Sequence, residues 1–293
     1  MTSWSLPADD NHVIIAGVTG RFGKELHTVI SDGYWPSGDP NWWTKVTYGL
    51  ASINNSSLGQ SFSTFTDENG TEVETFLISN FDDVRINQEK NTVLVDVSSV
   101  DNFENCLTFC SLNKIPYILA STGHTKEQLS NLNKLSKIVP VLLAPNLSEG
   151  ITVFKEEVLK PVLHYACNRG LVVVTGTCKE YSIKIKETHH KNKIDSPSGT
   201  ALDLKEFIEK NMFYPFYVRT NPKVKIESIR DESSIGSHEV SIKWDDEEIT
   251  LSHKAKDRKI FATGIERALN IKDFKPGLYS MKEILFELDD HKP

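Results

Sequence analysis

One short segment near the middle of the chain combines the residue types that acid–base chemistry requires. His189, His190, Lys191 and Lys193 place two imidazoles and two ammonium groups within five residues, in a chain whose formal net charge is −7. Histidine exchanges a proton near neutral pH, as the reduction of a C=N or C=C bond requires. Ammonium groups attract carboxylates. The segment is therefore our candidate for a catalytic site that acts on a small anionic substrate.

The residues that follow this segment predict the start of a helix. Residues 196–200 read Ser-Pro-Ser-Gly-Thr, and apolar residues then recur at helical spacing at Ala201, Leu204, Ile208 and Met212. The free N–H groups of a helix N-terminus bind anions, so this turn is suited to holding a carboxylate. The alternative is a solvated charged loop before an ordinary Ser/Pro helix start. We expect no metal, because the sequence indicates no third ligand nearby.

A second motif lies near the N-terminus and is typical of dinucleotide binding. The apolar run from His12 to Ala16 is followed by Gly17, Gly20 and Gly23, and then by a helical pattern over residues 24–30. Strand, glycine-rich turn and helix open a dinucleotide-binding fold, in which glycine lets the backbone approach a pyrophosphate. The spacing is Gly-x-x-Gly-x-x-Gly, and the alternative is a turn without a ligand.

The region that would bind the adenosine ribose has no acidic residue. A carboxylate is expected there about 20 residues after the glycine turn, but residues 53–57 read Ile-Asn-Asn-Ser-Ser and the next acid is Asp67. No carboxylate repels a 2′-phosphate, and no Arg or Lys pairs with one. The sequence thus predicts use of NADPH or NADH with a preference for NADPH.

The pattern of the first half predicts a parallel α/β sheet of the Rossmann type. Short apolar strands alternate with helical stretches at 101–113 and 126–137, and the strands are expected at 12–16, 45–52, 90–97, 115–120 and 138–144. We assign residues 1–147 to a dinucleotide-binding domain.

The second half has a different pattern of apolar and polar residues, which predicts an α+β domain with an open sheet. Helices are expected at 151–168 and 201–211, and strands at 171–175, 181–188, 224–230, 238–244 and 248–254. We assign residues 148–261 to this domain and 262–293 to a C-terminal segment with helices at 262–270 and 280–288.

Composition excludes several classes of protein. The chain of 293 residues is 39% hydrophobic and 25% charged, and its acidic balance disfavours nucleic-acid or anionic-membrane partners. No apolar run approaches the roughly 18 residues of a spanning helix. The N-terminus lacks signal-peptide character, and the four cysteines form no Cys-x-x-Cys pair. We expect a cytoplasmic protein, or a plastid protein if a transit peptide has been removed.

Taken together, these motifs resemble the dihydrodipicolinate reductase family. The family's signature, Glu-x-His-His-x-x-Lys-x-Asp-x-Pro-Ser-Gly-Thr-Ala, is intact from Glu187 to Ala201. The glycine turn is matched by residues 17–23, a Gly-Thr-Thr-Gly segment by residues 120–123, and the crossing into the second domain by residues 144–150. The resemblance extends from about Val13 to Leu285.

This resemblance implies roles for individual residues. His189 and Lys193 would be the catalytic pair, with His189 supplying the proton and Lys193 donating or steering a proton and binding substrate. The carboxylates of the substrate would be held by His190, Ser198, Gly199 and Thr200, with Thr122 approaching from the cofactor side. The dinucleotide would be lined by Gly17, Val18, Thr19, Gly20, Arg21, Phe22, Gly23, Ala120, Ser121, Thr122, Ala144, Pro145, Asn146 and Leu147.

The resemblance also implies a reaction and an assembly. Hydride would pass from NADPH or NADH to 4-hydroxy-tetrahydrodipicolinate, a small dicarboxylate heterocycle, and give tetrahydrodipicolinate for lysine and diaminopimelate biosynthesis. The second domain would bind substrate and form a homotetramer. In the cofactor wall, Ala120 and Leu147 depart from the family's glycine and aromatic residue, and residues 31–44 form a tryptophan-rich insertion that is most simply loop packing.

Two other functions compete with this one. The first is a reductase-derived binding or assembly protein without activity, which the intact His189, Lys193 and Ser198-Gly199-Thr200 set argues against. The second is a related amino-acid dehydrogenase acting, for example, on aspartate. The paired histidines and the lysine before Ser-Gly-Thr favour a dicarboxylate heterocycle instead.

Overall fold

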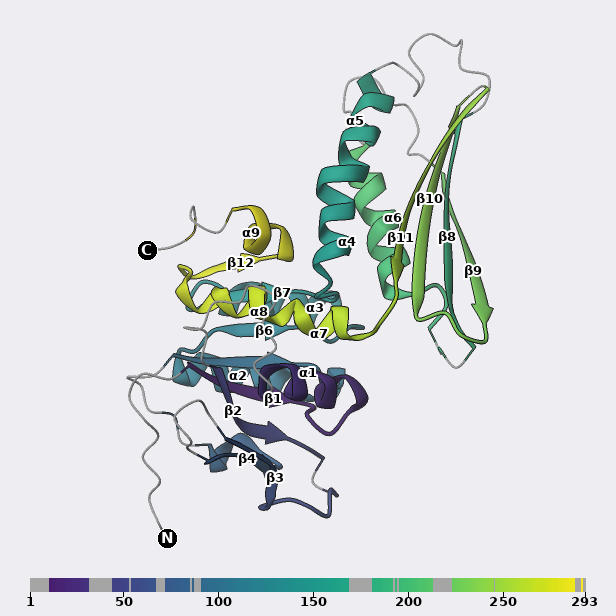
Figure 1. Ribbon diagram of the computed structural model, residues 1–293. Helices are drawn as coiled ribbons and strands as arrows, with labels where there is room; N and C mark the ends of the chain where they lie inside the picture. The colour runs from purple at the N-terminus through teal and green to yellow at the C-terminus, as the bar shows by residue number, and fades with distance from the viewer. Residues whose placement is uncertain are drawn as a thin grey trace. The chain divides into compact units, whose positions relative to one another are not determined.

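The chain divides into two compact units. In the computed structural model, one unit comprises Met1–Leu147 with Phe261–Pro293, and the other comprises Ser148–Ile260 (Figure 1). The structure describes residues 11–31, 44–52, 54–66, 72–84, 86, 91–168, 181–191, 193, 195–212, 223–244, 246–287 and 291. The strand predicted at 171–175 and nearly all of the tryptophan-rich insertion lie outside the described residues.

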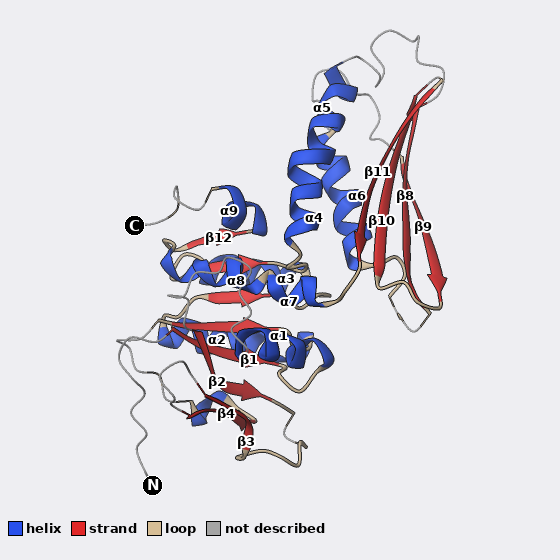
Figure 2. Ribbon diagram, in the orientation of Figure 1, coloured by secondary structure: helices blue, strands red, loops and turns tan. Residues whose placement is uncertain are grey.

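The first unit is built on an eight-stranded sheet with the order β12-β7-β6-β5-β1-β2-β4-β3 (Figure 2). Neighbouring strands are parallel except for the antiparallel β3–β4 pair. The strands are β1 (Asn11–Ala16), β2 (Thr44–Leu50), β3 (Ser61–Thr66), β4 (Glu72–Ile78), β5 (Thr92–Asp96), β6 (Tyr117–Leu119), β7 (Pro140–Leu143) and β12 (Gly277–Tyr279). The predicted α/β fold of the Rossmann type is confirmed.

Helices cover both faces of this sheet, which explains why its central strands are apolar throughout. Val93, Leu94 and Val95 of β5 are almost completely buried. One face packs against α1 (Arg21–Ser31), α8 (Ile265–Ala268), η4 (Leu269–Asp273) and α9 (Met281–Phe286). The other packs against α2 (Phe103–Asn113) and α3 (Lys126–Leu135). Short 3₁₀ turns are η1 (Phe81–Asp83) and η2 (Val100–Asn102).

Three strands of this sheet were not predicted from the sequence. β3 and β4 carry mostly Ser, Thr and Glu between their apolar residues, and β12 has only three residues. The buried His27 of α1 ties the added hairpin to the sheet, because its Nε2 lies 2.9 Å from the Ser63 hydroxyl and 3.0 Å from the Thr75 hydroxyl. The hairpin is therefore held by tertiary hydrogen bonds that a strand pattern does not reveal.

The C-terminal helix predicted at 262–270 is interrupted. α7 (Lys259–Thr263) ends before Gly264 and α8 begins after it. A Cβ atom at Gly264 would lie 1.7 Å from the carbonyl oxygen of Leu147, so the backbone of this segment packs directly against the end of the β7 crossing. The helix is therefore interrupted at Gly264 because two backbone segments pack closely there.

The second unit has a four-stranded sheet with the order β11-β10-β8-β9. Its strands are β8 (Tyr181–His190), β9 (Val224–Asp231), β10 (Gly236–Trp244) and β11 (Glu247–Ala255). β8 and β9 are parallel, and the other two pairs are antiparallel. The helices of this unit are α4 (Glu149–Val153), the π-helical η3 (Phe154–Leu159), α5 (Lys160–Asn168) and α6 (Gly199–Asn211).

One face of this second sheet forms the core with the helices. Ile183 and Ile185 of β8 and Val240 of β10 pack with Leu204 and Ile208 of α6. Residues between them along the strands, such as Lys184 and Lys186, are exposed. This alternation settles which side chains of β8 point toward α6. Among the described residues, no helix has both the length and the apolar character required to cross a bilayer.

We predict that Gly23→Ala destabilises the first unit. A Cβ atom at Gly23 would lie 2.1 Å from the carbonyl oxygen of Gly17, and backbone cannot yield as a side chain does. Overpacking of this kind costs about 1–3 kcal/mol. Thermal unfolding followed by circular dichroism should show a lower Tm. Gly199→Ala is the control and should not lower the Tm, because no atom of the described residues lies within 4 Å of a Cβ at Gly199 and its φ is not positive. An unchanged Tm for Gly23→Ala would contradict the packing.

Candidate active site

The three predicted cofactor segments lie at one edge of the first unit's sheet. β1, β6 and β7 are parallel, and they end at Ala16, Leu119 and Leu143. Residues 17–23, 120–122 and 144–147 each follow directly after one of these strands. The strand order reverses between β1 and β5, and ligands of open α/β sheets bind at the carboxyl ends of strands at such a point.

The turn after β1 has the close backbone approach that a pyrophosphate site requires. Gly17 has φ = 87°, and a Cβ there would lie 2.8 Å from the Cα of Ser98, in the loop that follows β5. The amide of Gly20 donates to the carbonyl of Gly17 at 3.0 Å, and α1 begins at Arg21. Free N–H groups at the start of α1 therefore lie beside a turn without side-chain bulk, which fits a dinucleotide phosphate.

In the second unit, the alternation of β8 positions the candidate acid–base groups. Ile183 and Ile185 face the helices, and the same period of two turns Glu187 and His189 to that side. Glu187 has no exposed surface and His189 is 8% exposed. His190, the next residue, is only half-buried. The apolar row of the core thus continues into a buried carboxylate and a buried imidazole.

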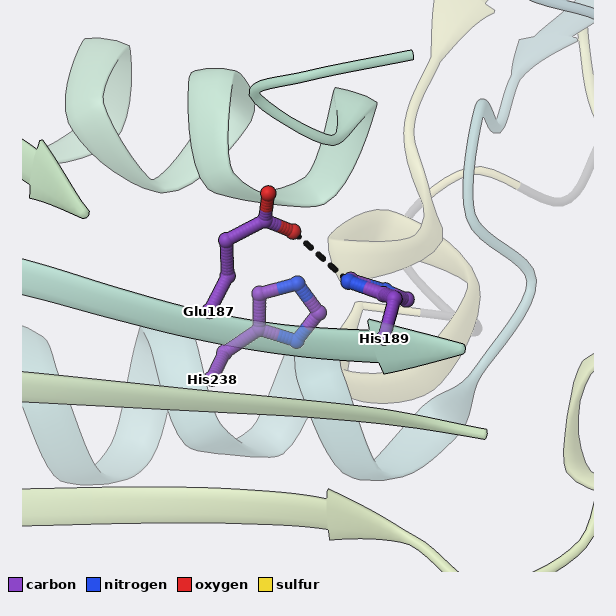
Figure 3. Close-up of side chains that lie close together, drawn as sticks. All are labelled: Glu187, His189 and His238. Carbon is purple, nitrogen blue, oxygen red and sulfur yellow. Dashed lines mark ion pairs between the residues drawn. The ribbon is translucent and has the colours of Figure 1, made fainter. Parts of the chain in front are cut away.

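The buried Glu187 carboxylate is surrounded by donors. Oε1 accepts from the amide of Ser198 at 3.2 Å and from both terminal nitrogens of Arg230 at 3.1 Å. Oε2 lies 2.7 Å from Nδ1 of His189 (Figure 3). Burial raises the pKa of Glu187, but hydrogen bonds from Ser198, Ser228 and Arg230 and the charge of His189 outweigh it and lower the pKa to about 2. The group is therefore an anion at neutral pH.

His189 is held with one nitrogen toward this anion. Burial lowers the pKa of His189 most, the charge of Glu187 raises it, and the charges of Lys193 and Arg230 lower it further. The net pKa lies below the ordinary value, so the imidazole is mostly neutral near pH 7. With Nδ1 facing Glu187, Nε2 is the nitrogen that can exchange a proton with a ligand.

His238 completes this buried cluster, although it was not among the predicted site residues. It pairs with Glu187 across the β8–β10 register, and its ring lies edge-on to that of His189 with centroids 5.2 Å apart. The Ser198 hydroxyl accepts from the amide of Ala201 and lies 3.2 Å from Nε2 of His238. Burial, followed by the charge of His189, lowers the pKa of His238 to about 4. His238 is therefore neutral, and the direction of its hydrogen bond with the Ser198 hydroxyl depends on which ring nitrogen carries the proton.

The remaining predicted groups of this unit lie around the same end of β8. Nζ of Lys193 forms an ion pair with Asp195 at 2.8 Å, and the side chain of Lys193 is about one quarter exposed. Nε2 of His190 lies 2.9 Å from the guanidinium of Arg258. Because a guanidinium only donates, His190 accepts through this nitrogen and has its proton on Nδ1. Arg258 thus settles the tautomer of a predicted substrate-binding residue.

The start of α6 offers room for an anion. Ser198 is the N-cap, and Gly199 and Thr200 are the first residues of this helix of 13 residues. No atom lies within 4 Å of a Cβ built on Gly199, so open space adjoins the helix N-terminus. The structure brings His189, His190, Lys193 and residues 198–200 together in the second unit. Thr122 belongs to the first unit, where it is exposed.

Glu187, His189 and His238 offer donor atoms that all lie within 4.8 Å of one another, a geometry open to a metal ion. The guanidinium of Arg230 already pairs with the Glu187 carboxylate, and its positive charge opposes a second cation there. We therefore assign the cluster to the binding and movement of protons.

Sequence reasoning missed Glu187, Arg230 and His238 as members of this site. The period of two along β8 was a usable signal for Glu187, because it puts that residue on the same face as His189. Arg230 lies 43 positions from Glu187, and His238 lies 40 positions from Ser198. Strand register brings Arg230 and His238 to the end of β8. No local pattern indicates that register.

We predict that acidification destabilises the second unit in two steps. The folded pKa of His238 lies near 4, below the ordinary 6.5, so the unfolded chain binds the proton more tightly and stability falls as pH drops from 6.5 to 4. The folded pKa of Glu187, about 2 against 4.5, extends the loss from pH 4.5 to 2. The His238 contribution has an upper bound of about 3 kcal/mol.

Urea unfolding at several pH values measures this dependence. His238→Gln should flatten the stability change between pH 6.5 and 4, whereas His164→Gln, on the exposed side of α5, should retain it. An equal slope in wild type and His238→Gln would refute the assignment.

Comparison with known proteins assigns the chain to a family. The model "Dihydrodipicolinate reductase, N-terminus" matches residues 11–147, and "Dihydrodipicolinate reductase, C-terminus" matches residues 169–285. A solved structure, dihydrodipicolinate reductase from Paenisporosarcina sp. TG-14 with dipicolinate bound, shares the fold with a TM-score of 0.65 and 20% identity, over 94% of this chain and 100% of that one.

Two curated relatives are named 4-hydroxy-tetrahydrodipicolinate reductase. The protein of Brachyspira hyodysenteriae is 33% identical over 71% of this chain and 88% of its own length. The protein of Buchnera aphidicola subsp. Cinara cedri is 30% identical over 93% of this chain and 96% of its own length. With both family models and these relatives spanning most of its length, the chain belongs to the dihydrodipicolinate reductase family.

Proposed function

We propose that this protein reduces 4-hydroxy-tetrahydrodipicolinate to tetrahydrodipicolinate with a reduced nicotinamide cofactor, in lysine and diaminopimelate biosynthesis. One observation carries the proposal: the buried Glu187–His189 pair lies beside Lys193 and the N-terminus of α6, in a chain of this family. The relatives named above act on this compound by name, and the solved neighbour binds dipicolinate, a related dicarboxylate.

The protein supplies the proton for this reaction. Reduced nicotinamide, when bound, provides hydride, and the reduction then needs a proton and the loss of water from the hydroxylated ring. His189 donates that proton from Nε2. Its pKa is low in the protein without substrate because of burial. Two incoming carboxylates add negative charge and raise this pKa, so substrate binding itself protonates the acid.

The carboxylates are held by the same end of the second unit. Lys193 and the backbone of Gly199 both contact Asp195 in the protein without substrate, and both exchange this partner for a substrate carboxylate, with Thr200 beside them at the start of α6. The amide and hydroxyl of Ser198 are both engaged within the protein, so Ser198 contributes by fixing this turn. His190 completes the set of substrate ligands that the second unit contributes.

The cofactor binds the first unit, along residues 17–23, 120–122 and 144–147. In the turn after β2, the amide of Asn54 donates to the Ser52 hydroxyl and the amide of Ser57 donates to the Asn55 side chain. These hydroxyl and amide groups leave the ribose 2′ position without a repelling carboxylate. We infer that both cofactors bind, with NADPH preferred.

The second unit also carries the proposed assembly. Its sheet has helices on one face, while on the other face alternate residues of β8 and β11 are exposed and those of β10 are mostly half-buried. We propose that this exposed face serves the homotetramer implied by the family resemblance and that the enzyme works in the cytoplasm.

We predict that NADPH binds at least as tightly as NADH. Fluorescence titration of the purified protein with each cofactor gives the two dissociation constants directly. A Kd for NADH at least tenfold lower than that for NADPH would overturn the preference, since hydroxyl and amide groups do not repel a 2′-phosphate as a carboxylate does.

We predict that His189→Ala lowers kcat by about 10²–10⁴-fold, the usual contribution of a general acid. The measurement is the oxidation of NADPH and of NADH with freshly prepared substrate. The control is the Kd for NADPH, which should stay near its wild-type value because His189 is not among the predicted cofactor segments 17–23, 120–122 and 144–147. If the folded wild-type protein binds both cofactors but oxidises neither, the chain is a binding or assembly protein instead.

A further inference from the structure

Glu187 opens the family signature, and the sequence assigns it no function. In the structure it is the residue through which the proton donor and the carboxylate-binding turn are connected. One carboxylate oxygen contacts Nδ1 of His189 at 2.7 Å, and the other accepts from the amide of Ser198 at 3.2 Å. The contact between Nδ1 of His189 and Oε2 of Glu187 is an ion pair, and neither of these buried atoms has a hydrogen-bond partner among the described residues.

We propose that Glu187 is a positioning residue that orients the His189 ring, keeps the proton of its neutral form on Nδ1, and holds the Ser198 turn at the start of α6. The inference rests on the proposed function insofar as His189 is the proton donor. It adds that two parts of the site, the acid and the anion-binding helix end, are set by one carboxylate.

A buried carboxylate performs this task only if its charge is stabilised. Glu187 has no exposed surface, and an isolated anion there would be strongly destabilising. Both terminal nitrogens of Arg230 bind Oε1 at 3.1 Å, so the anion is paired on the side away from His189. Arg230 thereby keeps Glu187 ionised and leaves Oε2 available to the imidazole.

The charges around His189 give Glu187 a second effect. Facing His189 are Glu187 from its own strand, Arg230 from β9, the neutral His238 from β10, and Lys193 from the loop after β8. The α6 end contributes the uncharged Ser198. Burial and the two cations lower the pKa of His189, and Glu187 opposes them. Without the carboxylate, a smaller fraction of His189 would carry the proton at a given pH.

Glu187→Gln tests this inference, because it keeps the shape of the side chain and removes its charge. The pKa of His189 should fall by about one unit or more, and one unit is a tenfold change in the protonated fraction above the pKa. The alkaline limb of the kcat profile should therefore move to lower pH, with a kcat about 10–100-fold lower at pH 7.5. KM for NADPH should remain near its wild-type value.

Two further variants separate positioning from a general structural role. Glu227→Gln makes the same change on an exposed glutamate of β9 that pairs with Lys184. Its pH profile of kcat should be the same as that of the wild type. Glu187→Asp keeps the charge and should restore the alkaline limb toward wild type even if kcat stays reduced by the shorter side chain. If Glu187 is merely structural, both Glu187 variants will have a lower kcat or Tm, and the alkaline limb of the kcat profile will not move.

Nuclear magnetic resonance of ¹⁵N-labelled histidine rings gives a readout that needs no turnover. In wild type, neutral His189 should have its proton on Nδ1; in Glu187→Gln its pKa should fall and this tautomer should lose its preference. The same pKa and tautomer in both proteins would overturn the inference. If the wild type shows no turnover with either cofactor but these ring signals change as expected, the proposed reaction fails while the positioning role stands.

Discussion

The ion pair between the buried Glu187 carboxylate and its neighbours is the interaction on which the second unit's site depends. A carboxylate with no exposed surface is tolerated because Arg230, the Ser198 amide and His189 surround it. Each partner comes from a different element: β9, the cap of α6 and β8 itself. The charge of Glu187 therefore connects β8, β9 and the start of α6. The positions of the groups that would contact a substrate depend on this charge.

We propose that both units hold an anion at the start of a helix. α1 begins after the Gly17 turn, and α6 begins at the Ser198 cap, so each unit has a helix N-terminus among its predicted ligand-binding residues. An overall charge of −7 does not favour anionic ligands, so local arrangement has to reverse it. We propose that backbone amides serve this purpose in the first unit and that Lys193 contributes to it in the second.

The first unit was the more predictable of the two. The central strands are continuous apolar runs because helices cover both faces, and that composition can be read without knowing any contact. The β3–β4 hairpin was missed because its stability comes partly from His27, whose hydroxyl contacts lie 36 and 48 positions away. In the second unit, alternation along β8 was sufficient to predict a strand but not to identify its neighbours.

The sequence by itself determined the α/β fold, the glycine turn, the His189–Lys193 segment and the helix start at Ser198, since each is written in residues adjacent along the chain. The family resemblance drew on the same local motifs. Tertiary structure alone decided that Glu187 is buried, that Arg230 and Ser198 bind it, and that His238 lies beside His189. These contacts follow from strand register and helix packing, which depend on the summed burial of whole elements rather than on any one short segment.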